Sequence, residues 1–508
     1  MKTVDSFLNK ITMYRLVLYY LIVLVLIAIG FSFFGLLPYS PFAILFSAFF
    51  ITAICVIANA IFSWAFDAPE NVESAYITAF ILILLITPTA STGDGQYFAI
   101  AIWASLIAIA SKYILAIKRK HVFNPAAIGV VVTALALNQS ASWWVGTMAM
   151  APFVLVGGLM ITRKIVRFDL VLSFFAVATM VTLGYHFVGI QSLPADIWRF
   201  YISTPVLFFA FVMLTEPLTT PPTRLRRIIY GVFVGFLFLP SLAIGSVFLT
   251  PEIALVVGNI LSYILSPKKK LLLDLHSRVE VASGVYDFGF GEGQLLSFKP
   301  GQYMEWTLAQ KRVDGRGNRR YFTIASSPTE SGLTIGVKFY PNPSTFKKQL
   351  VEMKGGDNIV AAQLAGDFTM PRNKKKKLVF IAGGIGVTPF RSMIKYLTDT
   401  GEKRDIVLLY SNKTPQDIAY KEIFDEAQRK LGIKVIYIVT DAQSATPDFK
   451  GKIGRIDQKM IESEIPDYQE RYFYVSGPHN MVSSFNDELK NIGIHRSHIK
   501  EDYFPGFA

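Results

Sequence analysis

Apolar residues dominate the first half of the chain, from about Tyr14 to Leu265, and charged residues become frequent only beyond Lys268. The apolar half divides into about ten runs, most of them near the ~17–25 residues that a helix needs to cross a bilayer. The runs lie near residues 14–36, 41–66, 75–88, 97–117, 125–138, 144–161, 168–189, 203–214, 228–249 and 250–266. This pattern predicts a polytopic α-helical membrane domain of about ten transmembrane helices over residues 1–270.

Three of these runs, at residues 75–88, 125–138 and 203–214, are short. Short spans interrupted by proline mark sites in many membrane proteins, because irregular backbone is tolerated in a bilayer only where it lines a cavity. Imprecise boundaries of the runs are the alternative explanation.

The second half of the chain has the pattern of a soluble protein in two parts. Residues 271–372 contain short alternating runs between Gly and Pro turns, such as "GQYMEWTL" and "LTIGVKFY", which predicts a small antiparallel β-barrel. Residues 373–508 alternate apolar strands with helical stretches, which predicts an α/β domain with a parallel sheet and crossover helices.

The composition agrees with a membrane protein. The 508 residues are 52% hydrophobic, with a mean hydropathy of +0.40, which is too apolar for an ordinary soluble protein. The first apolar run is long and lacks a small-residue cleavage site, so we expect no cleaved signal peptide. With Cys55 as its single cysteine, the chain cannot build a disulfide, a cysteine zinc site or an iron–sulfur cluster within itself.

Basic residues gather in alternate loops of the apolar half, at residues 118–120, 163–167, 224–227 and 268–270, and near the N-terminus. The opposite loops hold almost no base, with Arg199 as the exception. Because cytoplasmic loops carry the excess of Lys and Arg, we expect a multi-pass protein of the plasma membrane with both termini in the cytoplasm. The net charge of +13 therefore needs no nucleic-acid partner.

The segment "LVFIAGGIGVTP" places glycines where a buried strand turns into a helix. Gly383, Gly384 and Gly386 follow the strand, and Thr388 begins the helix. Such glycines allow backbone N–H groups to approach a phosphate, whose charge the helix N-terminus favours. A tight structural turn without a ligand has the same pattern.

The segment "RRYFTIASSP" presents Arg320, Tyr321, Phe322 and Thr323 on a strand. The planar guanidinium of an arginine suits a pyrophosphate, and an aromatic residue two positions further on points to the same face, where it can lie against a flat ring. A solvated edge strand is the alternative for this segment taken alone.

In their order along the chain these motifs resemble the ferredoxin–NADP reductase family, over residues 275–508. The resemblance implies bound FAD, with Arg320 on its pyrophosphate and the Ser and Thr of "NPSTF" on its diphosphate. The FAD-binding positions it implies are Arg320, Tyr321, Phe322, Thr323, Ser344 and Thr345.

The same resemblance implies a site for NADH or NADPH built from "GGIGVTP" and "YVSGPHNM". The positions it implies are Gly383, Gly384, Gly386, Thr388, Gly477 and Pro478. The tail "EDYFPGF" resembles the aromatic cover of the isoalloxazine, which assigns stacking to Tyr503 or Phe504. Ser476 stands where many relatives have cysteine; its hydroxyl can still help to position the nicotinamide for hydride transfer.

A ferric reductase or NADPH oxidase would join the same kind of module to a haem bundle, and this class is the alternative. Haem would need axial ligands, usually paired histidines on two helices. The apolar half contains only His121 and His186, and His121 lies in a basic loop. We therefore expect a cofactor other than haem in the membrane domain.

Two segments of the apolar half, "KYILAIKRKHVFNPAAIGVVV" and "FVMLTEPLTTPPTRLRRIIYG", resemble the flavin-carrying membrane components of the Rnf complex and of the sodium-translocating NADH:quinone reductase. This resemblance covers residues 10–266 and implies FMN and/or riboflavin inside the bundle. The positions assigned to this flavin are Asn124, Thr215, Glu216, Thr219 and Thr223. The alternative is structural, with Asn124 capping one helix and Glu216-Pro217 ending another.

These membrane flavoproteins attach FMN covalently to a threonine in a short motif of small residues with an upstream aspartate. In "NQSASWWVGTMAM" Thr147 lies at about the corresponding place. The aspartate and the small-residue pattern are missing, so covalent attachment at Thr147 is the less favoured arrangement.

Together these features predict a transmembrane NAD(P)H-dependent flavoprotein oxidoreductase. Electrons pass from cytoplasmic NADH or NADPH through FAD to membrane flavin, and then to a quinone or an extracellular acceptor; homo-oligomerisation is left open. A flavin transporter with a regulatory reductase domain and a redox-driven ion pump are the other hypotheses. A pump would favour acids inside the spans, whereas Asp67, Glu70, Glu73 and Asp94 are assigned to loops.

Overall fold

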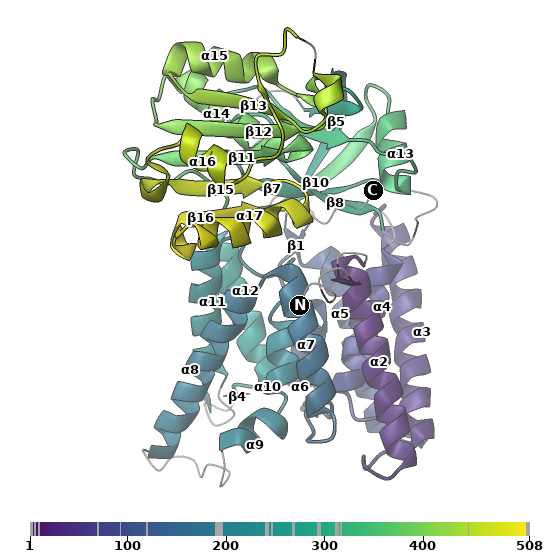
Figure 1. Cartoon of the computed structure of the whole chain (residues 1–508). Helices are drawn as coiled ribbons and strands as arrows, with labels where there is room; N and C mark the ends of the chain where they lie inside the picture. The colour runs from purple at the N-terminus through teal and green to yellow at the C-terminus, as the bar shows by residue number, and fades with distance from the viewer. Residues whose placement is uncertain are drawn as a thin grey trace. The chain divides into compact units, whose positions relative to one another are not determined.

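Two units make up the structure, a computed structural model of the chain: Met1–Lys269 and Lys270–Ala508 (Figure 1). We call them the N-terminal unit and the C-terminal unit. The residues described exclude 1–3, 5–6, 9–10, 69–70, 92, 118–119, 188–196, 239–242, 245–246, 267–269, 292–295, 310–313, 315–316, 446 and 504–508.

Helices that run side by side form the N-terminal unit (Figure 1). They are α2 (Met13–Phe33), α3 (Pro41–Ala65), α4 (Val72–Leu85), α5 (Gly95–Ile114), α6 (Pro125–Leu137), α7 (Ala151–Ile165), α8 (Phe168–Phe187), α9 (Ile197–Ile202), α10 (Val206–Phe208), α11 (Arg224–Leu237) and α12 (Pro251–Leu265). Two short hairpins join β1 (Ala116–Ile117) to β2 (Lys120–His121) and β3 (Ala243–Ile244) to β4 (Val247–Phe248).

Short polar side chains determine where several of these helices begin. Thr12, Ser40, Asn71, Asp94 and Asn124 each accept a hydrogen bond from the backbone N–H three residues further on. Such N-caps satisfy donors that the first turn of a helix cannot pair by itself.

The prediction of about ten transmembrane helices is not supported. Among the described residues, α2, α3 and α5 are long and apolar enough to cross a membrane. Four shorter apolar helices have 10–17 residues: α4, α6, α12 and the part of α8 from Phe168 to Gly184. One of the predicted spans, residues 203–214, is not a single helix: it forms the short α10, the π-helix η1 (Phe209–Met213) and a turn. Apolar composition in this unit therefore does not by itself identify a membrane-spanning helix.

The short helix α4 ends inside the unit, where an irregular segment satisfies its last carbonyl groups. The Leu85 carbonyl accepts from the Trp143 N–H at 2.9 Å, and the Leu84 carbonyl from the Val145 N–H at 3.3 Å. The indole Nε1 of Trp144 donates to the Ile83 carbonyl at 2.7 Å. This pairing lets a helix stop in an apolar interior, where unpaired backbone groups are costly.

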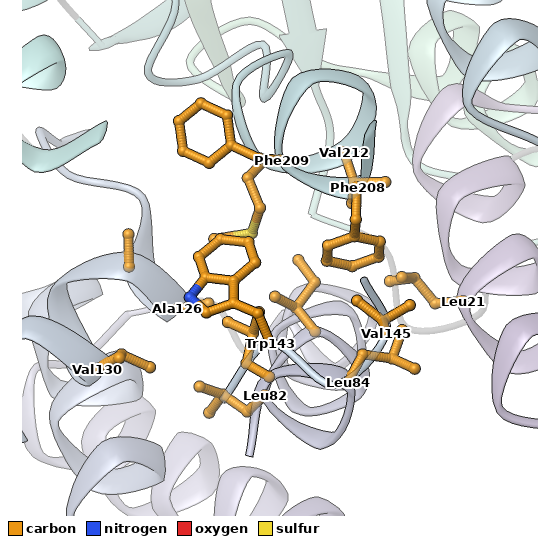
Figure 2. Packing of buried hydrophobic residues seen from close by; sticks show 14 of the residues in the cluster. Leu21, Leu82, Leu84, Ala126, Val130, Trp143, Val145, Phe208, Phe209 and Val212 are labelled. Atoms are coloured by element: carbon orange, nitrogen blue, oxygen red, sulfur yellow. The ribbon is translucent and has the colours of Figure 1, made fainter. Parts of the chain in front are cut away.

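Trp143 lies at the centre of the core of the N-terminal unit (Figure 2). Its ring centroid is 6.0 Å from that of Phe209 and 6.5 Å from that of Phe208. Around it lie side chains from α2, α4, α6 and η1, including Leu21, Leu82, Leu84, Ala126, Val130 and Val212. Since these residues are buried, the irregular segment around Trp143 and η1 is part of the packed interior.

The first part of the C-terminal unit is an antiparallel six-stranded sheet in the order β8-β7-β10-β5-β6-β9. Its strands are β5 (Lys270–Ala282), β6 (Val285–Phe290), β7 (Tyr303–Thr307), β8 (Arg319–Thr323), β9 (Leu333–Lys338) and β10 (Asn358–Ala365), with the helix α13 (Thr345–Glu352) between β9 and β10. The Ala325 N–H donates to the Thr334 carbonyl at 2.8 Å, so the chain after β8 meets the other edge strand, β9, as in the predicted barrel.

The second part is a parallel sheet in the order β14-β13-β12-β11-β15-β16. Its strands are β11 (Leu378–Gly383), β12 (Ile406–Asn412), β13 (Lys434–Val439), β14 (Lys452–Ile453), β15 (Tyr472–Ser476) and β16 (Ile499–Asp502). Its helices are α14 (Thr388–Thr400), α15 (Lys421–Leu431), α16 (Gln458–Glu464) and α17 (His479–Asn491).

Helices cover both faces of the parallel sheet (Figure 1). Phe380 packs in one cluster with Phe390 of α14 and Phe424 of α15, whereas Ile381 packs in another with Ile461 of α16. Neighbouring residues of a strand point to opposite faces. The apolar run at β11 is therefore continuous because both of its faces are buried.

Candidate cofactor and electron-acceptor sites

The glycine motif lies where the strand order of the parallel sheet reverses. From β11 the chain adds β12, β13 and β14 on one side, and then β15 and β16 on the other. In open α/β sheets, ligands bind outside the carboxyl ends of the strands at such a reversal. β11 ends at Gly383 and β15 ends at Ser476, so both predicted nicotinamide motifs meet at this edge.

The backbones of the two motifs touch. A Cβ atom added to Gly386 would stand 2.5 Å from the Gly477 Cα, and one added to Gly383 would stand 2.1 Å from the Met481 Sδ. Gly384 has a φ of +52° with open space where a Cβ would be. Glycine is thus required for backbone packing at Gly386 and is favoured by the backbone conformation at Gly384, whereas a side chain at Gly383 would displace the flexible end of Met481.

The other predicted nicotinamide-binding residues border the same edge. Thr388 starts α14, and its hydroxyl donates to the Ile385 carbonyl at 3.3 Å. Pro478 immediately precedes α17, and Ser476 is buried beside it. Two helices, α14 and α17, therefore begin here with their N-termini at the edge where the phosphate groups of a dinucleotide are expected.

The FAD motifs of β8 and α13 also come together. The guanidinium carbon of Arg320 lies 5.2 Å from the ring centroid of Phe346, which follows Ser344 and Thr345 in "NPSTF". The Phe322 ring is 6.0 Å from the same ring. Arg320 also donates to the Arg319 carbonyl at 2.7 Å and to the Gly317 carbonyl at 3.1 Å. A buried guanidinium is thus oriented next to a helix N-terminus.

The remaining predicted FAD residues have structural partners as well. Ser344 is the N-cap of α13 and accepts from the Lys347 N–H at 3.3 Å. The Thr345 N–H donates to a carboxylate oxygen of Asp314 at 3.0 Å, so an anionic group already lies at this helix N-terminus. Tyr321 donates to Glu305 at 2.7 Å, and Thr323 is buried at the end of β8.

Tyr503 does lie beside the nicotinamide motif. Its ring packs edge-on against His479 at the start of α17, with 4.5 Å between the ring centroids. Phe504, the other predicted stacking residue, lies outside the described residues. Asp502, which the sequence analysis did not select, ends β16 opposite Ser476, and burial raises the pKa of its carboxyl to about 7.

These arrangements fit the two cofactors that the sequence implies. For a dinucleotide, two helix N-termini and three glycines form a cradle that a side chain would fill. For FAD, the buried Arg320 provides a planar charged group that suits a diphosphate, beside the α13 N-terminus, where Asp314 and Ser344 already accept backbone hydrogen bonds. The donor sets therefore match a dinucleotide on the sheet edge and a diphosphate on the barrel.

In the N-terminal unit, the two segments assigned to membrane flavin meet as well. The Asn124 amide donates to the Met213 carbonyl at 3.5 Å, just before Glu216 in the chain. The Glu216 carboxylate accepts from the Thr219 hydroxyl at 3.1 Å and lies 3.4 Å from His121 Nε2. Segments about 90 residues apart thus form one cluster of amide, hydroxyl, imidazole and carboxylate groups.

Asn259 of α12 extends this cluster. Its side-chain oxygen accepts from the Asn124 N–H at 2.7 Å, and its amide nitrogen donates to the Tyr230 hydroxyl at 3.0 Å. A small recess, partly open to solvent, borders the cluster. It is lined by Ile117, His121, Val122, Leu218, Thr219, Asn259, Ser262 and Tyr263.

The space inside this recess is about 10 Å³, room for about one water molecule, whereas pockets that enclose drug-sized ligands have roughly 300–1,000 Å³. Its polar groups suit the edge of a flavin or quinone ring, but the volume does not enclose an isoalloxazine. The fit to a complete membrane flavin is therefore partial.

The other residues assigned to the membrane flavin have different surroundings. The Thr215 hydroxyl donates to the Phe211 carbonyl at 2.7 Å, back along the π-helix, and Thr223 precedes α11. Thr147 does not join the cluster: it lines a separate recess with Thr204 and Tyr201. Its hydroxyl is buried there without a hydrogen bond to any described residue.

Sequence reasoning missed two polar groups of the N-terminal unit. His121 was treated as part of a basic loop, although it faces Glu216. Glu252 is a buried acid in an apolar helix, and the indole Nε1 of Trp143 donates to its carboxylate at 2.9 Å. The single acid in the run "TPEIALVV" could have revealed Glu252, because an acid in an apolar segment is rarely without a partner.

The two nicotinamide motifs lie in a part of the chain that matches a known protein family. A family model described as the oxidoreductase NAD-binding domain matches residues 380–487. The reductase subunit of glycine betaine monooxygenase from Chromohalobacter salexigens is 30% identical over 213 residues, 41% of this chain and 57% of that protein. The reductase subunit of stachydrine N-demethylase from Rhizobium meliloti is 28% identical over 46% of this chain and 68% of that protein.

The chain carries a ferredoxin–NADP reductase-like FAD- and NAD(P)H-binding module. The matched range begins in β11 and ends in α17, so this reductase module includes both nicotinamide motifs. Its relatives are NAD(P)H-dependent oxidoreductases, and the module belongs to the same class of enzyme.

The match with these relatives covers only part of their length. The chain spans about 57% of the length of the glycine betaine monooxygenase reductase subunits that it matches. Among solved structures, the cytochrome b5 reductase domain of Ulva prolifera nitrate reductase is 23% identical with a TM-score of 0.42, covering 46% of this chain and 97% of that domain.

Proposed function

We propose that the protein is a transmembrane flavin oxidoreductase of the plasma membrane, with both termini and the reductase module in the cytoplasm. It takes electrons from NADH or NADPH and passes them through FAD to an acceptor at the N-terminal unit. We propose FMN or riboflavin as that acceptor, with a quinone or an extracellular compound receiving the electrons last.

In the reductase module, the residues act by binding and aligning two cofactors. FAD accepts a hydride and can release the electrons one at a time, which is the chemistry that this cofactor supplies when bound. Arg320 and the start of α13 hold its diphosphate, and Gly383–Thr388 with Gly477 hold the nicotinamide donor. Ser476, Tyr503 and Asp502 lie near the expected nicotinamide, where they help to align it and to exclude water.

Several observations support a membrane location for the N-terminal unit. Three helices are long and apolar enough to span a bilayer. Large apolar side chains of α2 and α3 are exposed, such as Phe33, Phe49 and Trp64, which is 84% exposed. In water such a surface would be unfavourable, but lipid tails would cover it. The basic loops support a cytoplasmic location for both termini.

The observation that carries the proposal is the polar cluster around Glu216. Residues 120–124 and 213–219 belong to the two segments that the resemblance to membrane flavoproteins assigns to one site. They contact each other through Asn124 with Met213 and through His121 with Glu216. Hydrogen-bonding side chains, among them His121, Thr219 and Asn259, line a small recess there. Since buried polar groups are costly in an apolar unit, a cluster of this kind supports a binding role.

The test separates electron input from electron output. In the variant with Glu216→Ala and Thr219→Val, NAD(P)H should bleach the FAD absorbance at the wild-type rate in a stopped-flow trace. Reduction of a quinone or external acceptor should fall about tenfold or more, because losing one hydrogen bond to the acceptor costs roughly 1–3 kcal/mol. Flavin extracted beyond FAD should be lost as well.

A matched control is Thr182→Val, which removes a buried hydroxyl of α8 that bonds only within its own helix, to the Ala178 carbonyl at 2.8 Å. This variant should retain both activities. Normal acceptor reduction and normal flavin content in the Glu216 and Thr219 variant would refute the acceptor site, whereas FAD that NAD(P)H cannot reduce in the wild type would refute the whole reaction.

A further inference from the structure

The two halves of the reductase module are joined by side chains that directly follow their cofactor motifs. Ala325 and Ser326 come just after the FAD motif of β8, and Arg391 and Ser392 lie in the first turn of α14 after the dinucleotide motif. Arg391 donates to the Ala325 carbonyl at 3.0 Å, and Ser392 donates to the Ser326 carbonyl at 2.7 Å. These two hydrogen bonds, which we call the joint, therefore connect the residues next to one binding motif directly with those next to the other.

Tyr420 provides a further contact between the two halves of the module. It belongs to the loop before α15, and its hydroxyl donates to an oxygen of Asp287 on β6 at 2.5 Å. The Arg391 guanidinium lies 5.7 Å from the centre of the Tyr420 ring and pairs with Glu330 at 2.9 Å. One aromatic hydroxyl thus connects the nucleotide-binding half with the barrel.

The barrel has a gap that fits this hydroxyl. Gly336 of β9 pairs directly with Asp287 of β6. A Cβ atom on Gly336 would stand 2.4 Å from the Tyr420 hydroxyl oxygen and 2.9 Å from a methyl carbon of Thr388. Only a glycine at this place lets Tyr420 reach Asp287 and lets Thr388, a residue of the dinucleotide motif, lie against the barrel.

The backbone of Tyr420 is held in a conformation that side chains rarely adopt. Its φ is +60° and its ψ is 25°, in the left-handed region that favours glycine. Such a conformation persists only where the surroundings enforce it, and it is common at sites that need a fixed geometry. The buried ring and its hydrogen bond to Asp287 provide that enforcement here.

We propose that Tyr420, through its hydrogen bond to Asp287, is a positioning residue that fixes the nucleotide-binding half on the barrel at the alignment needed for hydride transfer. This inference rests on the proposed transfer from NAD(P)H to FAD, in which a hydride carries two electrons and one proton. Hydride transfer needs the reacting atoms about 3–3.5 Å apart, and a shift of about 1 Å can cost about a hundredfold in rate. A contact far from the reacting atoms can therefore control the rate.

Three variants weaken the hydrogen bond in different ways. Tyr420→Phe removes the donor, Asp287→Ala removes the acceptor, and Gly336→Ala pushes the hydroxyl away while both partners remain. Each should lower the rate of FAD reduction by bound NAD(P)H about tenfold, with the FAD content near the wild-type value. The KM for NAD(P)H should stay near the wild-type value in Tyr420→Phe and Asp287→Ala, whereas Gly336→Ala should raise it because the new methyl group also meets Thr388. Asp287→Asn should behave as the wild type, because its amide oxygen still accepts the hydrogen bond.

The matched control is Tyr437→Phe. Tyr437 donates to Asp425 at 2.7 Å, a Tyr–Asp hydrogen bond of the same kind that lies wholly within the nucleotide-binding half. Its loss should leave the hydride-transfer rate unchanged. A second readout does not depend on turnover: the long-wavelength absorbance of reduced enzyme mixed with NAD(P)⁺, which reports how the two rings overlap, should weaken in Tyr420→Phe and not in Tyr437→Phe.

A wild-type rate and a wild-type absorbance band in Tyr420→Phe would overturn the inference. Equal losses in Asp287→Asn and Asp287→Ala would overturn the role of the hydrogen bond, and loss of FAD from all the joint variants would show a purely structural role. These outcomes differ from a failure of the proposed function, in which NAD(P)H would not reduce the FAD of the wild type.

Discussion

The backbones of Gly386 and Gly477 lie so close that a Cβ atom on Gly386 would stand 2.5 Å from the Gly477 Cα and 2.6 Å from its nitrogen. The first glycine follows β11 and the second follows β15, almost 100 residues later. The two nicotinamide motifs therefore form one packed structural feature, in which the backbone of one loop lies directly against that of the other.

Gly386→Ala should raise the KM for NAD(P)H about tenfold or more while FAD is retained. The new methyl group must displace backbone, and a loss of about 1.4 kcal/mol in binding is tenfold in affinity. Steady-state kinetics and the flavin absorbance of the purified variant measure the two quantities. Gly401→Ala is the control: it has a φ of +66° and open space at the end of α14, so it should lower stability and leave the KM unchanged.

Arg320→Ala should weaken FAD binding by roughly 10–100-fold, since a hydrogen bond to a charged group contributes about 1.5–3 kcal/mol. Arg320→Lys should give an intermediate affinity, because an ammonium keeps the charge without the planar fork. Titration of FAD into the apoprotein measures the Kd. Arg319→Ala is the control, since Arg319 pairs with Glu305 at 3.8 Å beside the site; full FAD content in Arg320→Ala would contradict the assignment.

The stability of the reductase module should fall as the pH rises from about 4 to 7. Burial raises the pKa of Asp287 to about 6, although the hydrogen bond from Tyr420 and the charge of Arg391 act in the opposite direction. The folded state therefore holds this proton more tightly than the unfolded state, whose pKa is near 3.9. The contribution of this proton to the free energy of unfolding is complete below pH 4 and is lost as the pH rises through 6.

The size of this effect is up to about 3 kcal/mol, from a pKa difference of about two units. Urea unfolding of the full chain, followed by the release of FAD fluorescence between pH 4 and 8, measures it. Asp287→Asn should reduce the pH dependence in this window, with Asp502, whose pKa burial raises to about 7, providing a remaining part. Asp425→Asn, which changes a partly exposed carboxylate, should leave the pH dependence unchanged. An unchanged slope in Asp287→Asn would show that another group titrates.

Thr147→Ala should leave the flavin content of the membrane fraction unchanged. The Thr147 hydroxyl is buried in a recess apart from the Glu216 cluster, so it is poorly placed to take a flavin phosphate. Denaturing gels of the wild type, viewed under ultraviolet light, should show no fluorescent band at the mass of the chain. A fluorescent band that Thr147→Ala abolishes would establish covalent attachment instead.

The sequence was sufficient for the parts of the fold that local pattern determines. Because both faces of β11 are buried, its sequence is a continuous apolar run, and glycines follow it directly. The strand, the turn and the start of α14 could therefore be recognised in "LVFIAGGIGVTP". The arginine and aromatic residues of β8 and the capping serine of α13 could likewise be read from short segments.

Features that depend on distant pairs could not be predicted. Hydropathy of residues 203–214 does not distinguish a span from the π-helix and turn that form there, because both bury the same side chains. Tyr420 and Asp287 are 133 residues apart, and neither belongs to a motif. His121 was assigned to a loop by its basic neighbours, whereas its position is determined by contact with Glu216, 95 residues later.

In the proposed bilayer, α4 ends with its last carbonyl groups bonded to a segment that is synthesised much later, with Trp144 lying 61 residues beyond its partner Ile83. Until that segment leaves the ribosome, those carbonyls need water, so α4 cannot remain in the lipid interior as an independent span. A nascent chain that stops before residue 142 should therefore insert α2 and α3 but leave α4 accessible to labelling from the aqueous side. Biogenesis of this unit thus proceeds by pairing segments, and not by adding one finished span after another.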